Sequence, residues 1–464
     1  MENKNGKNDE KFRILSLDGG GIRGLITALI LQEVEKQIQE VEGKEQSLLT
    51  YFDMIAGTST GSLLAAGIAT GQPIKKLINM YEKRGKEIFP SHGNWSLSNL
   101  VERAKLIGKY GLFAPKYDNT GLCNVLKDFF TENGKEIILE NVGRKPVDRK
   151  PVDRKKRGQE KPSPILLILA YDTLYRNTTF FTNYYSIEEY PNNTPWYSNK
   201  PLWKICASSA SAPTFFPGFE LSNWETSNIT CTENQKLQAR WSYPHVDGGV
   251  TVNNPSLCAI ARALDWGYKL ENISLLSIGT GKDTEPYEFK EIQGWGLIQW
   301  ATRITNVFMA GQGEVQDRIC RSLMGGRKSE RYLRLQFDLN QTMYTPDKLE
   351  KDDKLYNEIY KEVLKDQKIA LSDKELCKEF QGIAQMPVIH EKKLQKNHLI
   401  EERIDNDMSN ASEGNIELLK LATKEYINGN KSYTFETRYN RGSQIKEGIK
   451  RFILSKPQEV VNKP

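Results

Sequence analysis

One serine of this sequence stands between two glycines at the spacing of a known catalytic turn. Residues 57–61 read Gly57-Thr58-Ser59-Thr60-Gly61. The pattern G-x-S-x-G is typical of a nucleophile elbow, a sharp strand-to-helix turn that exposes a reactive hydroxyl. An apolar run precedes the segment and a run of small residues follows it, as such a turn requires. We therefore interpret Ser59 as a candidate nucleophile for an acyl-transfer reaction.

A nucleophilic serine needs a base, and the best candidate is an aspartate in the segment Asp247-Gly248-Gly249. The segment follows a short apolar approach, and glycines beside the carboxylate allow other backbone to come close to it. His245 lies two residues earlier, and we interpret it as a loop histidine rather than as the base. Asp247 is then the group expected to accept the proton of Ser59.

A serine, acid and histidine triad is the alternative. Ser59, Asp247 and either His390 or His398 occur in the order that an α/β-hydrolase would need. Only one strand can precede an elbow at residue 59, whereas that fold needs several. Both histidines also lie in a strongly charged stretch, which is a poor setting for a buried base. The residues therefore favour a dyad over a triad.

A glycine-rich turn comes first in the chain and satisfies G-x-G-x-x-G between an apolar run and a helical pattern. It contains Asp18, Gly19, Gly20, Gly21, Ile22, Arg23 and Gly24. One interpretation is a dinucleotide-binding turn, with Glu40 or Glu42 near the ribose. Asp18 argues against it, because a carboxylate beside the turn would repel pyrophosphate. The other interpretation is a set of N–H groups that stabilises a transient negative charge.

Strand-like and helix-like runs alternate, as in a doubly wound α/β domain. Strands are predicted at 12–17, 52–56, 164–171 and 273–278, and helices at 25–40, 60–69, 72–89, 201–211 and 412–427. A further helix is expected after Asp247, with Asn254 as its N-cap and Pro255 at its first position. The expected fold class is α/β, with a central, mostly parallel sheet.

The ordered set of motifs resembles the patatin-like phospholipase family. It comprises residues 18–24, 57–61 and 247–249, together with Ala207-Ser208-Ser209-Ala210, Ala212-Pro213, Phe215-Phe216-Pro217 and Gly279-Thr280-Gly281. The resemblance covers roughly residues 11–340 and resumes near 406–428. It implies a three-layer α/β/α sandwich.

The resemblance also implies roles for individual residues. Ser59 would be the nucleophile and Asp247 its base. Gly19, Gly20 and Gly21 would supply oxyanion-hole N–H groups, with Arg23 and Asp18 bracing the loop. Gly24, Gly57, Gly61, Gly248 and Gly249 would support these motifs. The implied activity is hydrolysis of acyl esters in membrane glycerolipids, with no metal and no organic cofactor; an esterase for soluble substrates and a non-catalytic module are the alternatives.

The net positive charge of the chain comes from one segment. Residues 144–161 hold nine basic and three acidic residues, which equals the net charge of +6 of all 464 residues. The rest is balanced, so a nucleic-acid-binding surface is not expected. The segment is interpreted as a solvated, disordered insertion; attraction to anionic lipid headgroups is the alternative.

The domain limits follow from composition. We expect a disordered N-terminus at 1–11, a catalytic domain at 12–340, a charged helical excursion at 341–405, and C-terminal helices that complete the domain at 406–464. The excursion at 343–405 or a partner protein is a candidate for gating the site. No apolar run reaches the length of a signal peptide or a membrane span, so the expectation is a cytoplasmic protein with reduced cysteines and at most peripheral membrane contact.

Overall fold

The computed structural model describes residues 11–90, 97–111, 114–143, 164–185, 195–222, 242–282, 292–326, 329–337, 339, 404–405, 407–428 and 445–455. The predicted disordered N-terminus, the basic insertion at 144–161 and the charged excursion at 341–405 lie outside the described residues, apart from residues 11, 404 and 405. None of the helices within the described ranges is both long and apolar enough to cross a membrane.

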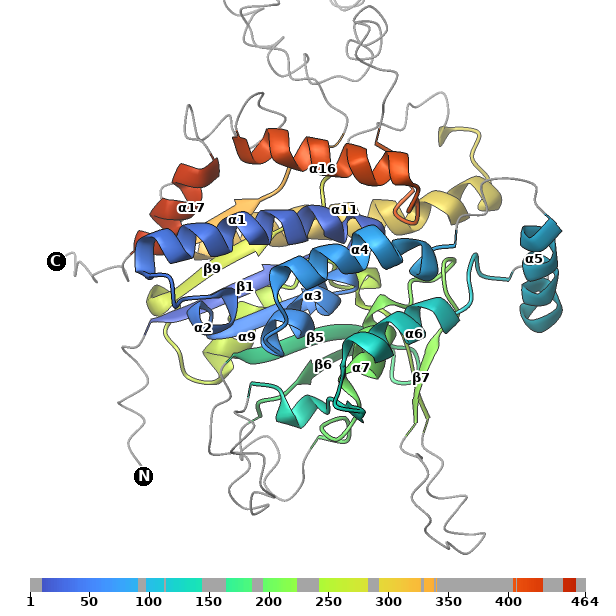
Figure 1. The fold of residues 1–464 in the computed structure, drawn as a ribbon, viewed down its shortest axis with the longest axis horizontal. Helices are drawn as coiled ribbons and strands as arrows, with labels where there is room; N and C mark the ends of the chain where they lie inside the picture. The colour runs from blue at the N-terminus through green and yellow to red at the C-terminus, as the bar shows by residue number, and fades with distance from the viewer. Residues whose placement is uncertain are drawn as a thin grey trace, which may run out of the picture.

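One sheet of eight strands runs through the centre of the described structure (Figure 1). In spatial order its strands are β10 (Tyr332–Leu335), β9 (Ile273–Ile278), β1 (Phe12–Leu17), β2 (Met54–Thr58), β5 (Ile165–Asp172), β8 (Ser242–Asp247) and β7 (Phe219–Ser222), with β6 (Asn177–Thr182) also paired to β5. Neighbours from β10 to β5 are parallel, whereas β6, β7 and β8 pair antiparallel. The predicted mostly parallel sheet is confirmed.

Helices cover both faces of the sheet, because its strands are apolar on both sides. In β1, Phe12 and Ile14 pack into one core, and Leu15 and Leu17 pack into the other, as the two-residue period of a strand requires. The first core is closed by α9 (Ser256–Asp265) and α11 (Leu297–Leu323). The second is closed by α1 (Gly24–Glu42), α3 (Thr60–Ala69), α4 (Ile74–Ile88), α6 (Thr120–Phe129) and α7 (Leu202–Ala210).

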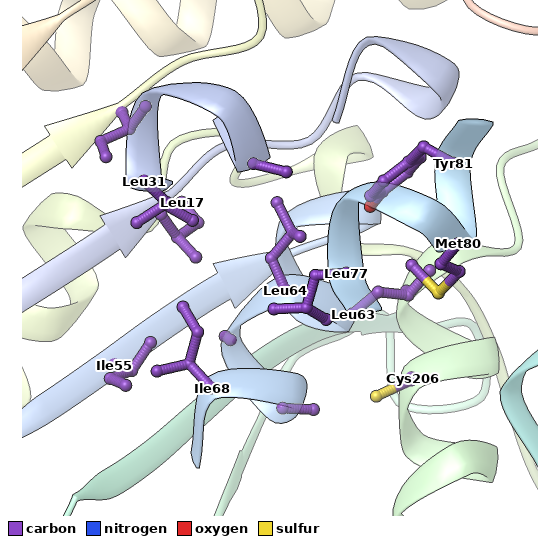
Figure 2. Close-up of a cluster of buried hydrophobic side chains, with 14 of the residues drawn as sticks. Leu17, Leu31, Ile55, Leu63, Leu64, Ile68, Leu77, Met80, Tyr81 and Cys206 are labelled. Carbon is purple, nitrogen blue, oxygen red and sulfur yellow. The ribbon is translucent and has the colours of Figure 1, made fainter. Parts of the chain in front are cut away.

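Figure 2 shows the part of the larger core where α3 and α4 meet the sheet. Leu63 and Leu64 of α3 lie close to Leu77 of α4, and Leu17 and Ile55 contribute from the strands. All five side chains are at most 3% exposed. Each such burial stabilises the fold by about 1.5–3 kcal/mol.

The end of the described chain packs on its beginning. Helices α16 (Glu413–Asn428) and α17 (Ile445–Leu454) both contact α1, and α17 also contacts the edge strand β10 (Figure 1). The rings of Phe337 and Tyr426 stack with their centroids 4.7 Å apart, which joins the end of β10 to α16. The α/β body and the C-terminal helices therefore share one hydrophobic core.

The predicted elements are present, with some shifted limits. β1, β9 and α3 have the predicted bounds, and α1, α4, α7, α16 and β5 differ by one or two residues. The strand expected at 52–56 lies at Met54–Thr58 instead. A short helix, α2 (Leu48–Tyr51), uses Phe52 as its C-cap, and a capping box of Ser47 and Thr50 begins it.

The start of α6 packs closely on the end of α4, and Gly121 lies at the contact. A Cβ at Gly121 would lie 1.8 Å from the Glu87 carbonyl oxygen. Gly121→Ala must therefore separate the two helices, and we expect it to lower the free energy of unfolding by about 1–3 kcal/mol. Denaturant unfolding measures the change.

The control is Gly311→Ala, because Gly311 lies inside α11 and a Cβ there would meet no atom within 4 Å. That substitution should leave stability unchanged or raise it by up to about 1 kcal/mol. Equal unfolding midpoints for the two variants would contradict the packing argument.

Candidate active site

Ser59 lies in the turn between β2 and α3, in a backbone conformation that side chains rarely adopt. Its φ is 53° and its ψ is −127°. A Cβ on Gly57 would lie 2.3 Å from the Gly61 carbonyl oxygen, and one on Gly61 would lie 2.2 Å from the Leu17 carbonyl oxygen. The glycines of G-x-S-x-G are therefore needed for this turn, which places Ser59 at the N-terminus of α3.

Two further serines hold the strained turn. The Ser59 N–H donates to Ser209 Oγ at 2.9 Å, and Ser209 Oγ donates to the Leu169 carbonyl of β5 at 2.6 Å. Ser62 Oγ donates to the Ser59 carbonyl at 2.6 Å. Ser209 belongs to one of the sequence motifs, but the sequence predicted no role for it, because the bond between Ser59 and Ser209 joins segments that are distant in the chain.

Ser59 and Asp247 meet at the carboxyl ends of β2 and β8. Ser59 Oγ donates to Asp247 Oδ2 at 2.5 Å, and the Gly249 N–H donates to Oδ1 of the same carboxylate at 2.7 Å. The second bond orients the carboxylate, so that Oδ2 faces the serine. The structure therefore brings together the two residues that the motifs predict as a pair.

The carboxylate of Asp247 is buried, with only 3% of the residue exposed. Burial raises the pKa of Asp247 to about 7, although the hydrogen bonds from Ser59 and Gly249 lower it in part. A carboxylate with a pKa near neutrality is a much better proton acceptor than one near its usual value of about 4. Ionised Asp247 can thus accept a proton from Ser59.

The glycine-rich loop passes beside this pair. The Gly19 N–H donates to the Asn253 carbonyl at 3.2 Å, so it is engaged within the protein. In the described part of the chain, the N–H groups of Gly20 and Gly21 donate to no acceptor. Gly21 lines the same pocket as Ser59. Of the three glycines expected to supply donors, Gly20 and Gly21 are therefore the available ones.

The Asp18 carboxylate, which was expected to brace the loop, binds a partner that the motifs do not contain. The two terminal guanidinium nitrogens of Arg334, Nη1 and Nη2, donate to the Asp18 carboxylate, and Nη1 also donates to Ser277 Oγ at 2.7 Å. Burial opposes the charge on Arg334, but the Asp18 carboxylate outweighs it and raises the pKa of the guanidinium. The one signal for this pair was an arginine inside the apolar strand Tyr332–Leu335.

Arg23, the second expected brace, is also buried, with 7% of the residue exposed. Its N–H donates to the Gly20 carbonyl at 3.2 Å, which helps to close the turn. Thr280 Oγ1 donates to the Gly19 carbonyl at 3.0 Å from the other side. The loop is therefore fixed by backbone and side-chain bonds at several points.

An apolar pocket opens beside Ser59 and Asp247. Its empty space is about 580 Å³ when the part open to solvent is counted. Most of its lining is apolar: Leu63, Tyr81, Ile88, Phe89, Leu122, Ala210, Ala212, Phe215, Phe216, Met309 and Met408. Ser59, Thr60 and Asp247 are the polar residues that reach it. The arrangement suits an apolar chain with a reactive group at one end.

Two predictions near Asp247 need correction. His245 lies within β8 rather than in a loop, because the antiparallel pairing of β8 with β5 extends through it. Its ring contacts the Tyr243 carbonyl and Thr179 Oγ1, and burial lowers its pKa. Helix α9 begins at Ser256 with Pro255 in the cap position, so the predicted helix is shifted by one residue.

Asn254 still helps to begin α9, because its Oδ1 accepts the Ser256 N–H at 3.0 Å. His390 and His398, the bases of the alternative triad, lie outside the described residues. Four of the six cysteines lie within the described residues, and these four are free thiols.

Comparison with known proteins agrees with the motifs. The profile of a family described as patatin-like phospholipase matches residues 15–260, which include Ser59, Asp247 and the glycine-rich loop. Patatin-like protein 1 of Arabidopsis thaliana is 32% identical over 329 residues, which are 65% of this chain and 68% of that protein.

Two other relatives align over similar lengths. Patatin-04/09 of Solanum tuberosum is 30% identical over 358 residues, covering 71% of this chain and 77% of that protein. Patatin-like protein 3 of Arabidopsis thaliana is 29% identical over 332 residues, or 66% of each chain. On this evidence the chain belongs to the patatin-like phospholipase family of lipid acyl ester hydrolases.

Proposed function

We propose that this protein hydrolyses acyl esters of membrane glycerolipids through a dyad of Ser59 and Asp247. The observation that carries the proposal is the 2.5 Å hydrogen bond between Ser59 Oγ and the buried Asp247 carboxylate, at the end of an apolar pocket. Family membership supports lipid ester hydrolysis, and the pocket suits an acyl chain.

Acylation begins when Ser59 Oγ attacks the ester carbonyl carbon and its proton passes to Asp247 Oδ2. The carbonyl oxygen becomes an oxyanion, and the N–H groups of Gly20 and Gly21 are the proposed donors to it. Losing one such donor typically costs about 3–4 kcal/mol of transition-state stabilisation. When the tetrahedral intermediate collapses, the protonated Asp247 returns its proton to the departing alkoxide.

Deacylation repeats the sequence with water. Asp247 accepts a proton from a water molecule, the resulting hydroxide attacks the acyl-serine, and the Ser59 oxygen leaves with the proton from Asp247. The products are a free fatty acid and the original enzyme. One carboxylate thus serves as base and then as acid in each half-reaction.

The alternative substrates and ligands fit less well. The apolar lining of the pocket suits an acyl chain better than it suits a small polar ester. A dinucleotide would need the space beside Gly19 and Gly20, where the side chains of Asn253 and Thr280 lie close enough to clash with an added Cβ.

Tryptophan side chains can anchor a protein at a membrane interface when they are exposed. Trp203 is buried and Trp196 stacks on Tyr243 at 3.8 Å, so both belong to the packed structure rather than to an exposed surface. Trp295 packs against Trp300, and Trp95 lies outside the described residues.

Removing either member of the dyad should abolish hydrolysis without unfolding the protein. We expect Ser59→Ala and Asp247→Asn each to lower kcat/KM by at least about 10³-fold, because both act in the same step. Hydrolysis of phospholipid and galactolipid vesicles, with products separated by head group and chain, measures the effect.

The matched controls are His390→Ala and His398→Ala, which should retain activity. A large loss in either one would favour the triad instead. Full activity in Ser59→Ala would exclude Ser59 as the nucleophile, and hydrolysis of soluble esters alone would remove the lipid substrate from the proposal.

The pKa of Asp247 predicts the pH profile. The base must be ionised, so kcat/KM should rise with pH to a plateau, with a midpoint near the pKa of about 7. At pH 5, only about 1% of the carboxylate would be ionised, which implies a rate about 100-fold below the plateau.

A soluble chromogenic ester suits this measurement, because the physical state of the substrate then does not change with pH. Ser59→Ala provides the background rate at each pH. A midpoint near the usual aspartate pKa of about 4 would contradict a buried Asp247 as the base.

A further inference from the structure

The turn at residues 407–409 lies directly against the glycine-rich loop. The Ile22 N–H donates to the Met408 carbonyl at 2.8 Å. Gly21 has a φ of +59°, and a Cβ there would lie 2.2 Å from the same carbonyl oxygen. Met408 is buried and lines the pocket together with Ser59 and Asp247. The backbone of Met408 therefore fixes the loop that carries the proposed oxyanion donors.

The turn at residues 407–409 is in turn held by a polar cluster. Asp407 Oδ1 accepts the N–H of Ser409 at 2.9 Å and its hydroxyl at 2.7 Å, which folds the chain around Met408. Lys116 Nζ donates to Asp407 Oδ2 at 2.5 Å and to Ser409 Oγ at 2.8 Å. The Tyr117 hydroxyl donates to Ser409 Oγ at 2.9 Å.

Lys116 and Tyr117 connect this turn to a second segment that lines the pocket. Their N–H groups donate to the carbonyls of Thr214 and Phe215, both at 2.8 Å. The ring of Tyr117 packs on Phe216, which also lines the pocket. The ion pair between Lys116 and Asp407 thus joins the turn around Met408 to the segment that contains Phe215 and Phe216.

The charges of this pair reinforce each other. Burial disfavours the charge on Lys116, but Asp407 outweighs it and the pKa of Lys116 is raised; the pKa of Asp407 is lowered, because Lys116 and Ser409 donate to it. Both groups are ionised at neutral pH. The side chains keep 38% and 36% of their surface exposed, so the pair can be removed without leaving a fully buried charge.

We propose that Lys116 and Asp407 are positioning residues for hydrolysis, which act through the Met408 carbonyl to hold the Gly20 and Gly21 amides in place. The inference rests on the proposed function, because it assigns those amides to the oxyanion. A small displacement of such donors is costly, since a misplacement of about 1 Å can lower a rate about 100-fold.

Lys116→Met and Asp407→Asn test the inference. We expect each to lower kcat at least about tenfold on short-chain and long-chain esters alike, with little change in KM, because the transition state and not the substrate loses its contacts. Exchange of the Ile22 amide hydrogen, followed by mass spectrometry, should become faster in both variants.

The matched control is Glu413→Gln. Glu413 pairs with Lys86 at 2.7 Å and anchors the same C-terminal segment, but neither residue contacts the pocket. It should keep the wild-type kcat. An equal loss in Glu413→Gln, or an unchanged kcat in Lys116→Met, would overturn the inference.

Failure of the proposed function gives a different result. Wild-type protein that shows no more hydrolysis and no more labelling by a fluorophosphonate than Ser59→Ala would refute the dyad itself. A second outcome is that the wild-type protein is active and is labelled at Ser59, and that the Lys116→Met and Asp407→Asn variants are equally active. This outcome would refute only the positioning role.

Discussion

The burial of the Asp247 carboxylate is the constraint on which the rest of the site depends. A carboxylate in solution is too weak a base to act on a serine, and burial raises its pKa to the range where proton transfer at neutral pH is feasible. Burial of a charge is costly unless the surroundings compensate. Here the Gly249 N–H and the Ser59 hydroxyl provide that compensation, and most of the neighbouring pocket is lined by apolar side chains.

The parallel part of the sheet explains why the groups converge. β1 and β2 end side by side, so the glycine-rich loop after β1 and the elbow after β2 must lie together. β8 runs antiparallel to β5, and the glycines that follow Asp247 allow close contact with β5: a Cβ on Gly248 would lie 2.3 Å from the Leu169 carbonyl oxygen. β2 pairs parallel with β5 and β8 pairs antiparallel with it, and together these pairings place the Ser59 hydroxyl beside the Asp247 carboxylate.

Features with local causes could be predicted from the sequence. The strand at 12–17, the helix at 60–69 and the elbow at Ser59 follow from apolar runs and glycine spacing within about 20 residues. The partners of the loop could not be predicted, because Arg334 is 316 residues from Asp18 and no motif marks it. Met408 contributes only a backbone carbonyl, which any residue would offer. The error at His245 has the same origin, since the pairing that makes it part of a strand comes from β5.

The two distant anchors of the glycine-rich loop also set an order for its assembly. Asp18 precedes its partner Arg334 by 316 residues, and Ile22 precedes Met408 by an even longer stretch. At about 5–20 residues per second, a ribosome needs tens of seconds to add the intervening length. Ser59 and Asp247 are both made before either anchor exists. A nascent chain therefore carries the proposed dyad before the glycine-rich loop has its native supports, and that loop is fixed only after Arg334 and Met408 have been added.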